Sequence, residues 1–368
     1  MSFRRHPRQS TSRRRAIPAA ALTLSLVATG IAAADSGDPL VVARARIFGI
    51  ENVDATGNVR SDRVILSWFG VSNFAMAIGG HVVLLDAWIP KGEYSGYVPI
   101  SPQELAALSP EAIFVGHSHF DHLADAGLII EASDPVIVGT PEHCAAARSF
   151  TEHPVRCEEI ATSSPGDMAE ISTLGPDVDI TVVRHVHSGA KPADTTDPHA
   201  PLLPPTDPGA VLNHPPSPAD SLHTLSHLPD PEGGSLLYQF RIGNFSLTWH
   251  DSTGPLKEDA PEVFNTLRAL PPTDVELSAI MGFDQFTNGL RDPRMYTEAL
   301  EPKLLVPEHH DNWAPPVTSR GENYRPALEA ELAKIPADSR PALRFISDPQ
   351  DYVRPEVLTF EVGNAAWD

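Results

Sequence analysis

Residues 117–122 read His-Ser-His-Phe-Asp-His and constrain the chain more than any other segment. An apolar run at 113–115 comes directly before them, so the hexapeptide follows what reads as a buried strand. Four metal-binding side chains fall within its six positions: His117, His119, Asp121 and His122. The first two are spaced to converge on one metal ion, and the last two can face a second. The spacing predicts a metal site in a loop at a strand end; the alternative is a run of surface histidines.

Short apolar runs dominate the chain from about residue 38 onward. They occur at 41–48, 64–68, 74–78 and 82–85, and turn residues separate several of them. Such runs predict antiparallel strands joined by tight turns. Helix signals and further strand-like runs then alternate along the chain. This order predicts an α/β (α+β) fold with a two-layer sheet core and helices outside.

Residues 190–232 differ in composition from the rest of the chain. Eleven prolines and four histidines crowd this stretch. A segment so rich in proline forms neither a central strand nor a long helix. We therefore predict a long Pro/His-rich insertion or lid within a domain that spans 38–368, and we expect it to shape the substrate pocket.

The first 34 residues have the order of an export signal. Six arginines and no acidic residue are followed by a modestly apolar run at 16–33 and by small residues. Arg13-Arg14-Arg15 resembles the twin-arginine form of such a signal. We predict that 1–34 is removed and that the protein is periplasmic or secreted; a basic tail on a cytosolic protein is the alternative. No later segment has eighteen consecutive apolar residues, so we expect no stable membrane insertion after signal removal.

Net charge and cysteine content limit the partners and the compartment. The chain carries a net charge of -21, and removal of the six arginines near its start would leave -27. A body this acidic repels phosphate backbones, so we expect no nucleic-acid partner. Cys144 and Cys157 lack the spacing of a zinc or redox pair, and in an oxidising compartment a disulfide between them is favoured.

Four further motifs flank or follow the hexapeptide. They are an acid after an early apolar run (Asp86), a histidine within His185-Val186-His187-Ser188, an aspartate after a hairpin strand (Asp251) and a histidine after a late run (His309). In this order the motifs resemble those of metallo-β-lactamase-fold hydrolases, over roughly residues 40–315. The resemblance implies an αββα sandwich with a binuclear metal site at one edge of the sheets.

The resemblance also implies a ligand set for two divalent ions, with zinc expected and manganese or iron as alternatives. It assigns His117, His119 and His187 to the first ion, Asp121, His122 and His309 to the second, Asp251 to a bridge, and Asp86 to an outer position. Two choices stay open. His185 competes with His187, because residues two apart share one face of a strand. His310 competes with its neighbour His309, which Pro307-x-His309 favours.

The implied activity is hydrolysis, in which a hydroxide that bridges two metal ions attacks a small ester, lactone or phosphodiester. Asp121 would orient this nucleophile and pass a proton to the leaving group. Pro307-x-His309 and His187-Ser188 resemble the branch that holds ascorbate-6-phosphate lactonases and N-acyl-phosphatidylethanolamine phospholipases, so the expected substrate is a small molecule or a lipid-like molecule. The alternative is a metal- or ligand-binding protein of the same fold without turnover.

Overall fold

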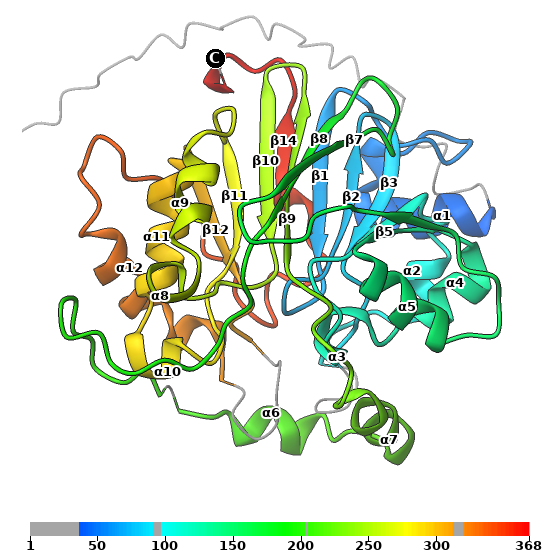
Figure 1. Ribbon diagram of the computed structural model, residues 1–368. Helices are drawn as coiled ribbons and strands as arrows, with labels where there is room; N and C mark the ends of the chain where they lie inside the picture. The colour runs from blue at the N-terminus through cyan, green and yellow to red at the C-terminus, as the bar shows by residue number, and fades with distance from the viewer. Residues whose placement is uncertain (1–36, 91–96, 204, 312–318, 368) are drawn as a thin grey trace, which may run out of the picture.

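The computed structural model describes residues 37–90, 97–203, 205–311 and 319–367. Two sheets lie face to face and helices cover their outer faces, so the predicted αββα sandwich is confirmed (Figure 1). The predicted export signal at 1–34 lies outside the described residues. Within these ranges, every helix is too short or too polar to cross a membrane.

The first sheet has seven strands in the order β14-β1-β2-β3-β4-β5-β6. β1 to β3 are antiparallel, and β3 to β6 are parallel. The predicted strands at 64–68, 74–78 and 82–85 are confirmed as β1 to β3. The bounds are β1 Arg63–Trp68, β2 Phe74–Ile78, β3 His81–Leu85, β4 Ala112–Phe114, β5 Val136–Gly139, β6 Cys157–Glu159 and β14 Thr359–Glu361.

The second sheet also has seven strands, in the order β13-β12-β11-β10-β9-β8-β7. β9 and β10 form the predicted hairpin, and β10 to β13 are parallel. The bounds are β7 Met168–Ile171, β8 Asp179–Arg184, β9 Leu236–Ile242, β10 Phe245–His250, β11 Val275–Ala279, β12 Leu304–Glu308 and β13 Ala342–Leu343.

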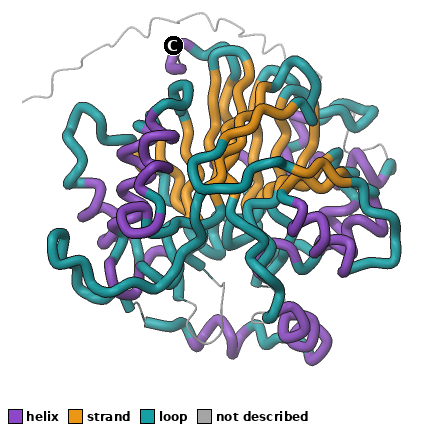
Figure 2. The backbone as a smooth tube through the Cα atoms, viewed as in Figure 1, coloured by secondary structure: helices purple, strands orange, loops and turns teal. Residues whose placement is uncertain are grey.

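The helices lie in two groups outside the sheets (Figure 2). Beside the first sheet are α1 Pro39–Phe48, α2 Pro102–Ala106, α4 Ala126–Ser133 and α5 Pro141–Ser149. Beside the second are α8 Leu256–Asp259, α9 Pro261–Arg268, α10 Gln285–Asn288, α11 Arg291–Leu300 and α12 Arg325–Leu332. The short α3 (Phe120–Leu123) carries the end of the hexapeptide, and Cys144 of α5 is joined to Cys157 by a disulfide.

The predicted strand at 41–48 is wrong, because this segment is helix α1. The Asp38 side chain accepts a hydrogen bond from the backbone N–H of Leu40 at 2.9 Å, and Pro39 occupies the first turn. Both features start a helix. Val41 and Phe48, which are seven positions apart and so share one face of the helix, are both buried. The dense apolar residues therefore have helical spacing, and the start signals before them outweigh their strand-like composition.

The Pro/His-rich segment contains two helices, α6 (Pro208–Asn213) and α7 (Pro218–His227), at the lower edge of Figure 1. The C-terminal end of this segment contacts the hexapeptide, because Ser118 Oγ donates a hydrogen bond to the Pro231 carbonyl at 2.6 Å. His223 Nε2 of α7 lies 3.1 Å from Asp125 Oδ1, close to α3. The segment thus contacts the chain immediately around the predicted metal site.

The buried faces of the two sheets are joined by large aromatic side chains. Phe114 of β4 makes edge-to-face contacts with Tyr238 and Phe240 of β9, with ring centroids 5.4 and 5.0 Å apart. The Tyr238 hydroxyl donates to the carbonyl of Val115 at 3.0 Å. These contacts fix the end of β4, where the hexapeptide begins, against the second sheet.

Candidate metal centre

Every predicted site residue follows the carboxyl end of a strand. Asp86 follows β3, the hexapeptide follows β4, His187 comes after β8, Asp251 follows β10 and His309 follows β12. Within each sheet these strands run in one direction, because β3 and β4 are parallel, β10 to β12 are parallel, and β8 and β10 are both antiparallel to β9. The strand ends therefore meet at one edge of the sandwich.

Two of these positions have an unusual backbone. Asp86 has a φ of 59° and His309 a φ of 53°. Residues other than glycine are uncommon in this left-handed region, and strain of this kind concentrates at functional sites. The sharp turns direct both side chains from the strand ends into the edge of the sandwich.

The structure brings the predicted residues together in three overlapping groups, and within each group the candidate ligand atoms lie within 4.8 Å of one another. The groups are His117, His119 and His187; Asp121, His122 and His309; and His117, His122 and Asp251. The three rings of the first group have centroids 4.5 to 4.8 Å apart. The third group shares one histidine with each of the other two.

Asp121 lies between the two histidines of its group. Its Oδ2 atom is 3.5 Å from His122 Nε2 and 3.5 Å from His309 Nε2. The rings of His122 and His309 are stacked, with centroids 5.2 Å apart. Two imidazole nitrogens and a carboxylate oxygen thus converge on one small region.

Asp251 is completely buried beneath both groups. Its Oδ2 atom lies 2.7 Å from His117 Nδ1 and 3.2 Å from His122 Nδ1. Gly116 makes this position accessible, because a Cβ atom on that residue would lie only 2.0 Å from Asp251 Cγ. The glycine before the hexapeptide therefore provides the space that the carboxylate occupies.

Asp86 orients His122. Its Oδ2 atom lies 2.7 Å from His122 Nδ1, and it also accepts a hydrogen bond from Ser72 Oγ at 2.6 Å. With Nδ1 engaged in this way, His122 directs Nε2 toward Asp121 and His309. Ser72 was not predicted, because a serine in the turn between β1 and β2 carries no metal-ligand spacing.

The structure separates His187 from His185, the first of the two pairs of alternative ligands. β8 ends at Arg184, so the premise that His185 and His187 lie on one strand face is wrong. His187 joins the first group, whereas His185 Nδ1 is 3.0 Å from the Tyr296 hydroxyl, away from that group.

His309 and His310 diverge in the same way. His309 joins Asp121 and His122. His310 instead has its Nε2 atom 3.2 Å from the Pro307 carbonyl oxygen, and its ring stacks on Phe345 at a centroid distance of 4.9 Å.

Comparison with known proteins agrees with this arrangement. Residues 67–243, which hold Asp86, the hexapeptide and the histidine after β8, match the family described as the metallo-beta-lactamase superfamily. The chain is therefore similar to metal-dependent hydrolases of that superfamily.

Similar proteins extend the match beyond these residues. A protein named metal-dependent hydrolase from Pyrobaculum neutrophilum is 25% identical over 267 residues, which cover 72% of this chain and 92% of that protein. Another so named, from Anaeromyxobacter dehalogenans, is 24% identical over 73% of this chain and 82% of its own length. The solved structure of Igni18, described as a metallo hydrolase from Ignicoccus hospitalis, aligns with a TM-score of 0.51 at 16% identity and covers 81% of this chain and 99% of its own.

The histidines of the first group are in the form that binds metals. Burial, together with the charges of His119 and His122, lowers the pKa of His187 to about 3. Burial also lowers the pKa of His117 and of His119. All three imidazoles are therefore neutral near pH 7 and have a lone pair available for a metal ion.

Several buried carboxyl groups surround His122. Burial and the nearby Asp86 carboxylate raise the pKa of Asp251, and burial with the charge of Asp251 raises that of Glu308. Burial opposes protonation of His122, but Asp121, Asp86 and Asp251 outweigh it and raise the pKa of His122 well above its ordinary value. Burial alone would also raise the pKa of Asp121, but His122 and His309 hold it well below its usual range.

These residues fit a pair of divalent cations. Asp251 Oδ1 and His122 Nε2 are buried, and no residue in the described part of the chain forms a hydrogen bond with either atom. Unpartnered buried polar atoms are costly, and a cation between them would remove that cost. Imidazole nitrogen together with carboxylate oxygen is a donor set typical of zinc and related metals.

Proposed function

We propose that the protein is an exported, binuclear hydrolase of small esters, lactones or phosphodiesters. One observation carries the proposal: two groups of three candidate ligands lie side by side, and buried Asp251 contacts a histidine of each. Hydrolases that use two metal ions need about this number of protein ligands and a group that is shared between the two sites. The relatives named metal-dependent hydrolases support the same reading.

The ligand assignment follows the groups. His117, His119 and His187 would hold one ion, Asp121, His122 and His309 the other, and Asp251 Oδ1 is the buried oxygen available to both. Divalent ions there would supply Lewis acidity and ease the deprotonation of water near neutral pH. Zinc is the preferred metal, with manganese and iron as alternatives.

The chain's own groups support attack by water on an acyl or phosphoryl centre. Asp121 is ionised at neutral pH and accepts hydrogen bonds only, so it can orient a water molecule that donates to it. Asp86 holds His122 in one ring orientation through the contact between Oδ2 and Nδ1. Ser72 supports Asp86 from the other side.

Export is proposed from two features. Six arginines followed by an apolar run and small residues have the order of an export signal. The disulfide between Cys144 and Cys157 supports the proposal, because such bonds persist in oxidising compartments. Cell fractionation with an N-terminal sequence of the purified protein tests it, and a cytosolic protein with an intact start would refute it.

The hydrolase proposal is tested by metal analysis and by turnover. We expect about two metal ions per chain after purification without chelator, and loss of both metal and activity in His117→Ala and Asp251→Ala. A panel of chromogenic ester, lactone and phosphodiester substrates, with zinc or manganese added, identifies the reaction. Metal without turnover on the whole panel would favour the alternative, a binding protein of this fold. No bound metal would refute both.

A further inference from the structure

A pocket lies next to the first histidine group, at the end of β8. It has a volume of about 410 Å³, and His187 is one of the residues that line it. The remaining lining comes from the chain around this strand end and from the close of the Pro/His-rich segment: Pro165, Arg184, His185, Val186, Ser188, Gly189 and Glu232. A pocket of this size suits a small molecule or the head of a larger one.

Arg184 is built into the wall of this pocket. It is the last residue of β8, and its half-buried side chain packs on Gly234. A Cβ atom on Gly234 would lie 1.9 Å from Arg184 Nη2 and 2.1 Å from Cζ, so only glycine leaves room for the guanidinium. Gly234 also has a φ of +94°, which other residues rarely adopt. Two features of Gly234 thus allow the arginine to occupy this place.

The charge of Arg184 interacts with the nearby Asp167 carboxylate, but the two side chains form no ion pair. Within the described ranges, its guanidinium forms no hydrogen bond and no ion pair. Glu232 also lines this pocket, where its Oε1 accepts a hydrogen bond from Ser235 Oγ at 3.0 Å, and within the described ranges it forms no ion pair with Arg184. The cation therefore faces the pocket with its donors available.

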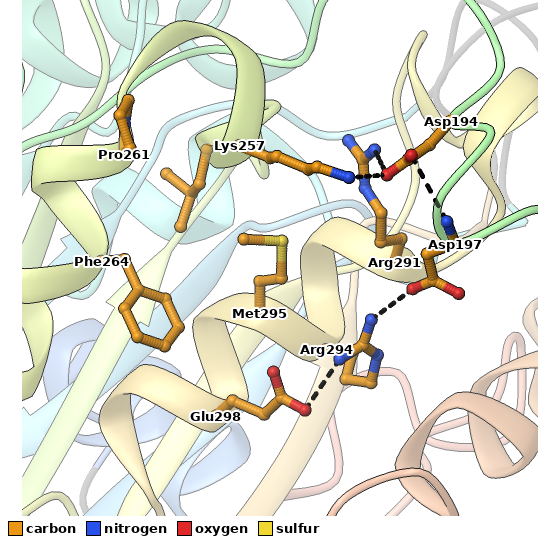
Figure 3. Close-up of a pocket in the computed structure, with 10 residues that line it drawn as sticks. Asp194, Asp197, Lys257, Pro261, Phe264, Arg291, Arg294, Met295 and Glu298 are labelled. Carbon is orange, nitrogen blue, oxygen red and sulfur yellow. Dashed lines mark hydrogen bonds and ion pairs between the residues drawn. The ribbon is translucent and has the colours of Figure 1, made fainter.

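A second pocket, shown in Figure 3, illustrates the contrast. It has a volume of about 420 Å³ and is lined by two arginines. Arg291 lies 2.9 Å from Asp194, and Arg294 lies 2.7 Å from Asp197. Those charges are already paired within the fold, so that pocket offers no comparable site for an anion.

We propose that Arg184 binds an anionic group of the substrate, a carboxylate or a phosphate, while the scissile bond lies at the histidine groups. The proposal rests on the proposed hydrolase function. A planar guanidinium pairs with either anion through two parallel hydrogen bonds. In a chain with a net charge of -21, an anionic substrate needs such a local cation to approach the centre.

Two esters of the same length test the proposal. Para-nitrophenyl pentanoate is neutral, whereas mono-para-nitrophenyl glutarate ends in a carboxylate. For Arg184→Gln we expect kcat/KM on the glutarate ester to fall about 10- to 100-fold, mainly through KM, the range for one lost hydrogen bond to a charged group. The pentanoate ester should change less than about threefold. An equal loss on both esters would reduce Arg184 to a packing role and overturn the proposal.

The matched control is Arg241→Gln, which removes the same charge at the opposite end of the β8–β9 pair, where Arg241 faces Asp179. It should leave both esters unaffected. Inhibition by acetate and by methyl phosphate distinguishes the two anions, since Arg184→Gln should weaken inhibition by the recognised one. If neither weakens, the proposal fails. If Arg184→Gln does not fold, Arg184→Lys keeps the charge without the planar fork and should give a smaller loss on the glutarate ester.

A direct binding measurement separates this proposal from the hydrolase function. If the wild type cleaves neither ester, calorimetric titration of glutarate and methyl phosphate into wild type and Arg184→Gln still applies. Weaker binding of either anion to the variant supports Arg184 as an anion site even without turnover. Equal binding of both anions overturns it, whatever the outcome of the hydrolysis assays.

Discussion

The substitution Gly116→Ala tests the role of Asp251 without replacing a candidate ligand. The added Cβ would lie 2.0 Å from Asp251 Cγ and 2.1 Å from Oδ2. Carbon atoms in contact are normally about 3.5 Å apart, so the carboxylate must retreat by roughly 1.5 Å. A movement of this length is enough to separate two hydrogen-bonded atoms until they are no longer in contact. We expect it to break the 2.7 Å contact between Asp251 Oδ2 and His117 Nδ1.

The expected cost has two parts. Overpacking of a buried site destabilises by about 1–3 kcal/mol, which corresponds to a melting temperature lower by roughly 2–6 °C. Loss of the Asp251 position should also reduce metal affinity by at least the 10- to 100-fold seen when a supporting carboxylate is displaced. Thermal melting and metal titration measure the two parts separately.

Gly189→Ala serves as the control, because a Cβ there would meet nothing within 4 Å. It lies on the same side of the sandwich as His187, two residues further along the chain, but should leave melting temperature and metal content unchanged. If Gly116→Ala binds two metal ions with wild-type affinity, Asp251 is not held in place by this glycine, and the reasoning fails.

Three further predictions concern the same region. Asp86→Asn should lower metal affinity about 10- to 100-fold by weakening the 2.7 Å contact with His122, whereas retained affinity would contradict an orienting role. Metal analysis should show loss for His187→Ala and none for His185→Ala; the reverse would exchange their roles. Burial lowers the pKa of His310 to about 3, below its ordinary value of about 6.5. The contribution of neutral His310 to the free energy of unfolding is therefore present above about pH 6.5. It is lost as the pH falls toward 3, by up to about 1.4 kcal/mol per pH unit. Denaturant unfolding from pH 7 to 4 should therefore be less pH-dependent in His310→Phe, and an unchanged slope would refute this.

Local patterns in the sequence were sufficient for much of the fold. The runs at 64–68, 74–78 and 82–85 become β1 to β3 because each is short, apolar and bounded by turns. The run at 41–48 has the same composition but is helical, because Asp38 and Pro39 provide a helix start that composition alone conceals. The helix-start residues therefore determine the structure of this segment, because its hydrophobicity alone fits either a strand or a helix.

The site was predictable where it depended on chain order and not where it depended on packing. Asp86 and Asp251 follow strands whose ends meet, so their proximity follows from topology. Period-two reasoning could not separate His185 from His187, because β8 has already ended before both. The positions of Ser72 and Arg184 depend on contacts with residues distant in the sequence, Asp86 and Gly234, and no spacing rule marks them.

The distribution of charge favours the binding of cations at this edge. Asp86, Asp251 and Glu308 are all buried, and burial raises the pKa of each. Repulsion by Asp86 adds to the rise for Asp251, and repulsion by Asp251 and Asp86 adds to the rise for Glu308. His122 interacts electrostatically with all three, and its single positive charge cannot balance three ionised carboxylates. Asp86 belongs to the first sheet, whereas Asp251 and Glu308 belong to the second, so their repulsion acts across the sandwich. Divalent ions would convert this repulsion into attraction, and part of their binding free energy would then stabilise the packing of one sheet on the other.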